Sequence, residues 1–133
     1  MLLNVYNRFN VSFVKGKGVY LYDDQGNEYL DFVSGIAVNC LGHAHPVIAE
    51  ALRKQGETLI HISNLYHSEA QTKLVDKLIG LSKHKSVFFS NSGTEANELA
   101  IKIARKFGNN INSNKTEIIY MKDSFHGRST GSL

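Results

Sequence analysis

The stretch from residue 87 to residue 107 constrains the fold more than any other part of the chain. It opens with residues 87–89, a β-forming run that is too short for a helix and is closed by turn residues, which predicts a strand. Apolar side chains then recur with the spacing of one helix face, at Ala96, Leu99, Ala100, Ile103, Ala104 and Phe107. A second apolar run at 117–121 predicts another strand. Strand, helix and strand in this order indicate a βαβ unit, and therefore an α/β fold with a parallel sheet.

The polar turn at 90–94 has two interpretations. In the first, Ser92 or Thr94 simply caps the helix that follows. In the second, the unpaired N–H groups at the helix start bind an anion, above all a phosphate, and Gly93 allows the ligand to approach closely. The missing Lys-Ser/Thr ending excludes a nucleotide P-loop. Ligands of parallel sheets bind beyond the carboxyl ends of the strands, where both 90–94 and 122–130 are expected, and this favours the phosphate interpretation.

The first half of the chain predicts a hairpin. Residues 19–22 and 28–33 are rich in β-formers and flank the polar loop 23–27, which contains a glycine. Residues 1–13 show no clear period and are expected to form an extended arm, followed by a turn at 15–18.

Two further helices are expected between the hairpin and residue 87. Pro46 suits the first position of one of them, in which Gly56 is a weak point. The other begins after Ser68, which forms a capping box with Gln71 three residues further on.

Composition narrows the class of protein. The 133 residues carry 15 Lys and Arg against 12 Asp and Glu, and the basic residues are spread along the chain, so nucleic acid is not an expected partner. No apolar run approaches the length of a membrane span, and we expect no membrane contact. The single cysteine, Cys40, rules out an internal disulfide and suits the cytoplasm; we expect it to be a buried small residue.

Six histidines raise the question of a metal site. Their spacing matches neither the Cys/His pairs of zinc turns nor the helix-face pairs four residues apart, so we expect no metal. His43 and His45 are expected to shape a loop, with their side chains hydrogen-bonded to the backbone.

Residues 125–128, Phe-His-Gly-Arg, form the other candidate site. Arg128 on such a loop could bind a carboxylate in a bidentate pair, and Phe125 offers a flat face to an aromatic ligand. The alternative places Phe125 in the core and Arg128 in solvent as a surface charge.

Three motifs together resemble the class III aminotransferases. The run at 24–46, which ends in Leu-Gly-His-Ala-His-Pro, is followed by Asn-Ser-Gly-Thr-Glu-Ala-Asn-Glu at 91–98 and by Phe-His-Gly-Arg at 125–128, in the order and spacing of that family. The motifs lie in register over nearly the whole chain. Within the family, the resemblance is to the acetylornithine aminotransferase group of arginine biosynthesis.

The resemblance implies a fold-type-I enzyme that depends on pyridoxal 5'-phosphate and works as a homodimer. By this resemblance, Gly93 and Thr94 donate backbone N–H groups to the cofactor phosphate, with Ser92 beside them. Phe125 stacks on the pyridine ring of the cofactor, and Arg128 binds the α-carboxylate of the substrate.

The resemblance also implies that the chain is an N-terminal part of the enzyme. Residues 1–65 correspond to an arm and small-domain segment, and residues 66–133 to the start of the large cofactor-binding domain. The family's catalytic lysine and the aspartate that holds the pyridinium nitrogen lie further downstream, so this stretch by itself is expected to be inactive.

The expected reaction is amino-group transfer between N-acetylornithine and 2-oxoglutarate. Within the family, ornithine and 4-aminobutyrate are the alternative amino donors. Outside it, the alternative is a non-catalytic phosphate-binding module.

Overall fold

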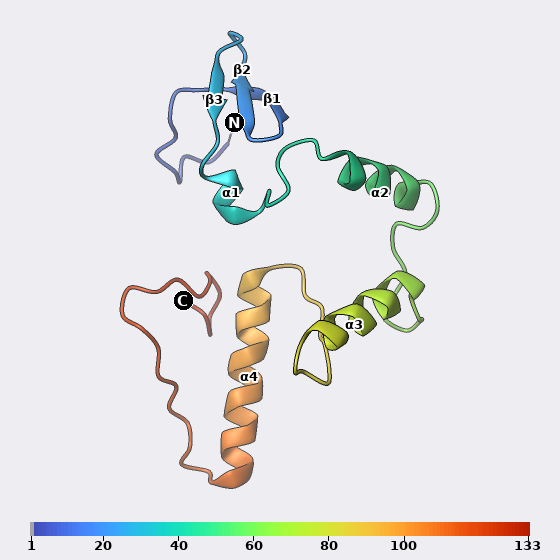
Figure 1. Cartoon of the computed structure of the whole chain (residues 1–133). Helices are drawn as coiled ribbons and strands as arrows, with labels where there is room; N and C mark the ends of the chain where they lie inside the picture. The colour runs from blue at the N-terminus through green and yellow to red at the C-terminus, as the bar shows by residue number, and fades with distance from the viewer. Residues whose placement is uncertain (1) are drawn as a thin grey trace. The chain divides into compact units, whose positions relative to one another are not determined.

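The computed structural model describes residues 2–133, which form two units, residues 2–66 and residues 67–133 (Figure 1). The first unit contains β1 (Phe13–Lys17), β2 (Tyr20–Asp23), β3 (Glu28–Leu30), α1 (Ser34–Ala37) and α2 (Pro46–Gly56). The second contains α3 (Glu69–Leu81) and α4 (Gly93–Ile111).

The sheet of the first unit is an antiparallel meander in the order β1-β2-β3. The β2–β3 hairpin confirms the prediction from the sequence. The expected arm and the turn at 15–18 are wrong in part, because β1 pairs with β2 from Phe13 to Lys17 and the chain turns only at Gly18, where φ is 58°. Only Phe13 and Val14 of its five residues favour strands, and the two lysines and the glycine that follow are depleted in them, so the pairing with β2 decides the conformation of Lys15–Lys17.

Asp23 closes the hairpin loop. Its carboxylate accepts hydrogen bonds from the backbone N–H groups of Gln25 and Asn27, at 2.9 and 2.8 Å, and from the side chains of Asn27 and Tyr29, at 2.9 and 3.0 Å. These donors, the Asn27 side chain first, hold the pKa of Asp23 below its ordinary value. Asp23 is therefore a charged residue that its own loop accommodates in a buried position, at 6% exposure.

A second carboxylate, Asp31, joins the sheet to the loop before α2. One oxygen accepts the N–H groups of Val33 and Ser34, and the other lies 2.7 Å from Nε2 of His43. Two backbone hydrogen bonds between His43 and Gly18 complete the junction. The sequence predicted that His43 shapes a loop and that its side chain bonds to the backbone. The first prediction is confirmed, but the second is wrong, because the side chain contacts the carboxylate of Asp31.

Helix α1 is a left-handed turn rather than an ordinary helix. All four of its residues have φ between 53° and 65°, including the β-branched Ile36. Non-glycine residues seldom adopt this conformation, which costs about 1–2 kcal/mol per residue. Cys40 follows the turn and is exposed, contrary to expectation, with its thiol donating to the carbonyl of Ala37.

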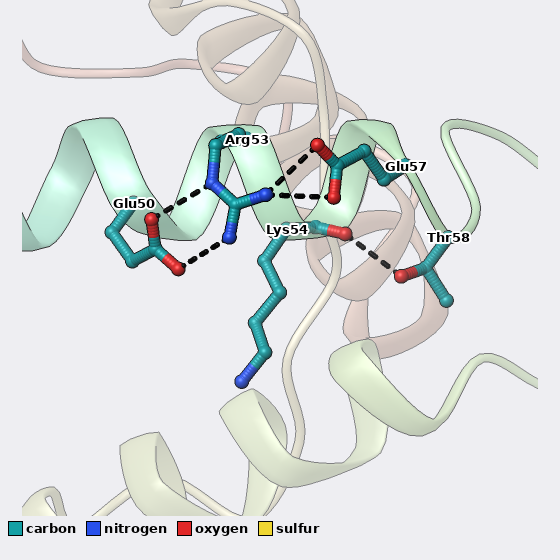
Figure 2. Close-up of polar contacts among 5 residues, drawn as sticks. All are labelled: Glu50, Arg53, Lys54, Glu57 and Thr58. Carbon is teal, nitrogen blue, oxygen red and sulfur yellow. Dashed lines mark hydrogen bonds and ion pairs between the residues drawn. The ribbon is translucent and has the colours of Figure 1, made fainter.

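Helix α2 begins at Pro46 and ends at Gly56, the residues that the sequence marked as its start and its weak point. Figure 2 shows how Arg53 bonds to Glu50 one turn before it and to Glu57 one turn after it, at 2.8–2.9 Å. All three side chains are exposed, so these ion pairs support the helix only weakly.

The second unit lacks the expected strands. Neither 87–89 nor 117–121 has a β partner among the described residues, so the βαβ unit is not formed as a paired sheet. A strand exists only through a neighbour that accepts its hydrogen bonds, and parallel neighbours come from distant parts of a sequence. Helices satisfy their own backbone, and α3 and α4 accordingly form where they were predicted, each with the expected serine before its first residue.

Burial is slight in both units. Among residues 2–133 no apolar side chain is buried, and large ones such as Phe32, Ile119 and Leu133 are at least 90% exposed. No helix among these residues has the length and apolar character that crossing a membrane requires. A chain with this much uncovered apolar surface has faces that other protein surface is expected to cover.

Candidate functional site

The candidate site of the second unit starts at the cap of α4. The hydroxyl oxygen of Ser92 accepts the N–H of Glu95 at 3.2 Å, and the carboxylate of Glu95 accepts the N–H of Asn91 at 2.7 Å. The reciprocal pair fixes the entry of the chain into a helix of 19 residues. The capping interpretation of Ser92 is thus confirmed.

The cap does not use the first two N–H groups of α4. Among the described residues, those of Gly93 and Thr94 have no hydrogen-bond partner, and they lie at the positive end of the helix dipole. A Cβ atom built on Gly93 would meet nothing within 4 Å, so the space around this position is open. Capping by Ser92 and anion binding by Gly93 and Thr94 are therefore compatible, although the sequence presented them as alternatives.

The C-terminal segment returns to this end of α4 (Figure 1). The side-chain amide of Asn97 donates to the carbonyl of His126 at 2.5 Å. One carboxylate oxygen of Glu98 accepts the hydroxyl of Ser129 at 2.5 Å and the N–H of Gly131 at 2.8 Å. The first turns of α4 thus hold the segment that carries the Phe-His-Gly-Arg motif.

Gly127 makes the closest approach between this segment and the helix start. Its φ is 148°, and a Cβ atom there would overlap the side chain of Ser132 and lie 2.8 Å from Oγ1 of Thr94. Only glycine fits this position without displacing its neighbours. The two loops that the sequence singled out, 90–94 and 122–130, therefore meet in the structure.

Phe125 and Arg128 lie together at the edge of the segment. The guanidinium carbon of Arg128 is 5.7 Å from the centroid of the Phe125 ring, a cation–π contact. The ring is 74% exposed, so the interpretation of Phe125 as a core residue is wrong for this chain. His126 packs edge-on against Tyr120, with ring centroids 6.1 Å apart.

The charge of Glu98 is stabilised by the same contacts. Hydrogen bonds from the Ser129 hydroxyl and then from the Gly131 N–H lower the pKa of Glu98 below its ordinary value, against a smaller effect of desolvation. Glu98 is accordingly an acceptor for the loop at neutral pH rather than a proton donor. Within residues 2–133 no group of three or more His, Cys, Asp or Glu side chains is placed to hold a metal ion.

Sequence reasoning missed the residues that hold the two loops together. Both Asn97 and Glu98 lie within the second motif, but Glu98 suggested only a favourable charge near the start of the helix, and Asn97 and Ser129 received no role. The available signal was their place on the first turns of the helix that follows residues 90–94, the candidate phosphate cradle. The contact itself spans about thirty residues, and no periodicity in the sequence reports a pairing of that kind.

Known proteins resemble this chain in both sequence and fold. The profile of the family "Aminotransferase class-III" matches residues 3–133. The acetylornithine aminotransferase of Nitrosomonas europaea is 54% identical over 132 residues, which is 99% of this chain and 34% of that protein. This chain spans about a third of the length of the curated relatives it matches.

Two solved structures extend the comparison to the fold. The ornithine aminotransferase of Toxoplasma gondii superimposes with a TM-score of 0.86 and 27% identity, over 98% of this chain and 32% of that chain. The taurine:2-oxoglutarate aminotransferase of Bifidobacterium kashiwanohense, a complex with PLP and glutamate, gives a TM-score of 0.75 and 28% identity over 81% of this chain and 25% of that chain. These neighbours are consistent with a partial fold-type-I architecture, and with the match of the family profile they establish that the chain belongs to the class III aminotransferases.

Proposed function

We propose that this chain is the N-terminal part of a pyridoxal-phosphate-dependent aminotransferase that moves an amino group between N-acetylornithine and 2-oxoglutarate in arginine biosynthesis. The identity to an acetylornithine aminotransferase over nearly the whole chain supports this substrate assignment. Residues 1–65 are its arm and small-domain segment, and residues 66–133 begin its cofactor domain. The enzyme works as a homodimer in the cytoplasm, a compartment that suits the free, exposed thiol of Cys40.

The cofactor assignment rests on one observation, the two N–H groups at the start of α4 that lack a hydrogen-bond partner among the described residues. Gly93 and Thr94 offer these donors to a phosphate, and the Ser92 hydroxyl, which accepts at the cap, keeps its own proton to donate. When bound, pyridoxal phosphate supplies the electron sink that amino transfer needs. The exposed ring of Phe125 provides an aromatic face for it.

Arg128 binds the carboxylate of the amino acid or of the 2-oxo acid. Its guanidinium is suited to a bidentate pair, and the Phe125 ring beside it restricts the orientations that the side chain samples. Both substrates carry a carboxylate next to the reacting carbon, so one arginine serves both half-reactions.

The test replaces single N–H groups in the full-length protein. Gly93 occupies the first helical position, and the extended backbone of Ser92 before it is compatible with proline, so Gly93→Pro removes one donor without breaking α4. A charge-assisted hydrogen bond contributes about 1.5–3 kcal/mol, and we expect cofactor affinity to fall about 10- to 100-fold.

Gly93→Ala is the matched control, because it keeps the N–H group and its Cβ atom meets no protein atom within 4 Å. Cofactor affinity is read from the absorbance of bound pyridoxal phosphate during titration. Equal affinities for the proline and alanine variants would show that the phosphate does not use this N–H group.

Ornithine is the second candidate donor, because a named ornithine aminotransferase matches the fold over 98% of this chain. 4-Aminobutyrate is a further alternative within the family. We expect the ratio kcat/KM of the full-length protein to be highest with N-acetylornithine. A higher ratio with ornithine or 4-aminobutyrate would reassign the substrate and leave the cofactor proposal intact.

The 133-residue chain alone is expected to be inactive in amino transfer. A non-catalytic phosphate-binding module would instead behave as a compact monomer that binds phosphate ligands reversibly and lacks transaminase activity in any longer form. Sedimentation and activity measurements on the short and full-length proteins separate these two functions.

A further inference from the structure

We propose that Asn97 and Glu98 are positioning residues, which hold the segment carrying Phe125 and Arg128 against the start of α4. This inference rests on the proposed function for the roles of the cofactor cradle and of Arg128. It adds the two residues that join these parts and to which neither the motifs nor the comparisons assign a role.

The anchors lie on both sides of Arg128. Asn97 holds the carbonyl of His126 before it, and Glu98 holds the hydroxyl of Ser129 after it. A loop fixed at two points that are three residues apart has little freedom between them, so the backbone of Arg128 is fixed while its side chain remains exposed.

Glycines permit this close packing. A Cβ atom on Gly131 would lie 2.7 Å from a carboxylate oxygen of Glu98, and one on Gly127 would lie 2.8 Å from the hydroxyl of Thr94. Both distances are too short for a real Cβ contact. The segment therefore approaches α4 as closely as the backbone allows, at the carboxylate of Glu98 and at the cradle residue Thr94.

The charge of Glu98 strengthens the anchor. Its carboxylate accepts two donors from the segment, and hydrogen bonds to a charged acceptor are stronger than those between neutral groups. The N-terminal end of α4 thus has two roles. The free N–H groups of its first turn bind the proposed phosphate, and the side chains of Asn97 and Glu98 in its second turn hold the loop that binds the substrate carboxylate.

The test compares Glu98→Ala with the parent in the full-length protein loaded with pyridoxal phosphate. Misplacement of a binding group by about 1 Å costs up to about 100-fold, so we expect KM for the amino acid and for the 2-oxo acid to rise about 10- to 100-fold. We expect kcat and the dissociation constant of the cofactor to change less than about twofold, because the cradle N–H groups remain.

Three further variants separate positioning from general stability. Glu98→Gln keeps an acceptor oxygen at the same reach and is expected to restore most of the loss in KM. Ser129→Ala is expected to add little to Glu98→Ala, because both remove the same contact. Glu117→Ala, at an exposed carboxylate in the same unit, is the control and is expected to leave every constant unchanged.

A second readout is independent of activity. Backbone hydrogen exchange of residues 126–132 in the same protein is expected to quicken about tenfold in Glu98→Ala and to stay unchanged in Glu117→Ala. Unchanged exchange in Glu98→Ala overturns the proposal. A second outcome also overturns the proposal: Glu98→Ala lowers the thermal midpoint and the amount of cofactor retained but leaves KM unaltered. That result would identify Glu98 as a residue that only stabilises the fold.

Failure of the proposed function gives a different pattern. In that case the parent protein shows neither amino transfer nor the absorbance of bound cofactor, while the exchange measurement still decides whether Glu98 holds the segment. Quickened exchange would then support the anchor in a protein of another activity.

Discussion

The two units of this chain differ in how far apart in the sequence the residues lie whose contacts hold each unit together. In the first, each strand pairs with its neighbour in sequence, and the carboxylate of Asp23 is satisfied within its own loop. In the second, the stretches expected to be strands have no partner among the described residues, and the main tie is between α4 and a segment about thirty residues further along. The strands of the first unit find their partners within a few residues of sequence, whereas the strands predicted at 87–89 and 117–121 in the second unit have none among the described residues.

This difference follows from how the two kinds of sheet satisfy their backbone. A meander needs only short turns between its strands, so a few tens of residues suffice to form it. A parallel sheet needs crossovers and is normally covered on both faces, so its strands depend on many other elements. In residues 67–133 the structure contains two helices and one loop that is anchored to α4.

The largest expected effect contrasts the isolated 133-residue chain with the full-length protein. Because no apolar side chain among residues 2–133 is buried, we expect the isolated chain to bind a hydrophobic dye strongly and to associate at micromolar concentration. The full-length protein is expected to do neither to a comparable extent. Analytical ultracentrifugation with dye fluorescence measures both, and a monodisperse, dye-free monomer of the short chain would contradict the need for further covering elements.

The same difference explains what the sequence could predict. The hairpin at 19–33 and the starts of α2, α3 and α4 depend on turn residues, proline and capping serines, which act on residues a few positions away. Strand β1 was missed because its pairing with β2, rather than its composition, makes it a strand. The strands at 87–89 and 117–121 were predicted from apolar runs, but a run does not supply a partner.

The residues of the candidate site also differ in whether local sequence or a long-range contact determines their role. Ser92 as a cap was predictable, and its neighbours Gly93 and Thr94 were identified from the free N–H groups of any helix start. The motif resemblance supplied the roles proposed for Phe125 and Arg128. The anchor from Glu98 was not predictable, because nothing in the sequence of an exposed glutamate shows which distant donors it accepts.

Gly127→Ala disrupts the long-range contact between α4 and the C-terminal segment in the second unit. Its expected effect is the next largest. The added Cβ atom collides with the side chains of Thr94 and Ser132 at a φ that alanine adopts only under strain of about 1–3 kcal/mol. In the full-length protein we expect KM for the substrates to rise about 10- to 100-fold. Gly80→Ala, inside α3 with no atom within 4 Å, is the control and should leave KM unchanged; an equal KM in both variants would remove the argument for close packing.

Asp31→Asn tests the first unit, and the expected effect is smaller because the sheet itself remains paired. His43, and then the N–H of Ser34, lower the pKa of Asp31, so its contribution to stability is present above its unfolded pKa of about 4 and is lost as the pH falls through the lower folded value. We expect the amide of Gly18, which pairs with His43, to exchange about tenfold faster in the variant at neutral pH.

Acid provides the internal check on Asp31. In the parent protein, exchange at Gly18, corrected for the intrinsic effect of pH, should quicken only below about pH 4 and should approach that of the variant there. The exposed Asp24, one residue past β2, supplies the control Asp24→Asn. If Asp24→Asn and Asp31→Asn behaved alike, the contact between the Asp31 carboxylate and Nε2 of His43 would have no part in holding the loop.

The smallest expected effect compares two helix caps within the second unit. Loss of the hydroxyl in Ser92→Ala should destabilise α4 by about 1 kcal/mol, and Ser68→Ala should destabilise α3 by no more than that, because its hydroxyl lies 3.5 Å from its N–H donor against 3.2 Å for Ser92. Amide exchange in the first turn of each helix measures the two losses. Only Ser92→Ala should also weaken cofactor binding, about fivefold if its hydroxyl contributes about 1 kcal/mol to the phosphate site. Equal cofactor affinities in the two variants would reduce Ser92 to a cap, and the start of α4 would then bind its anion through backbone N–H groups alone.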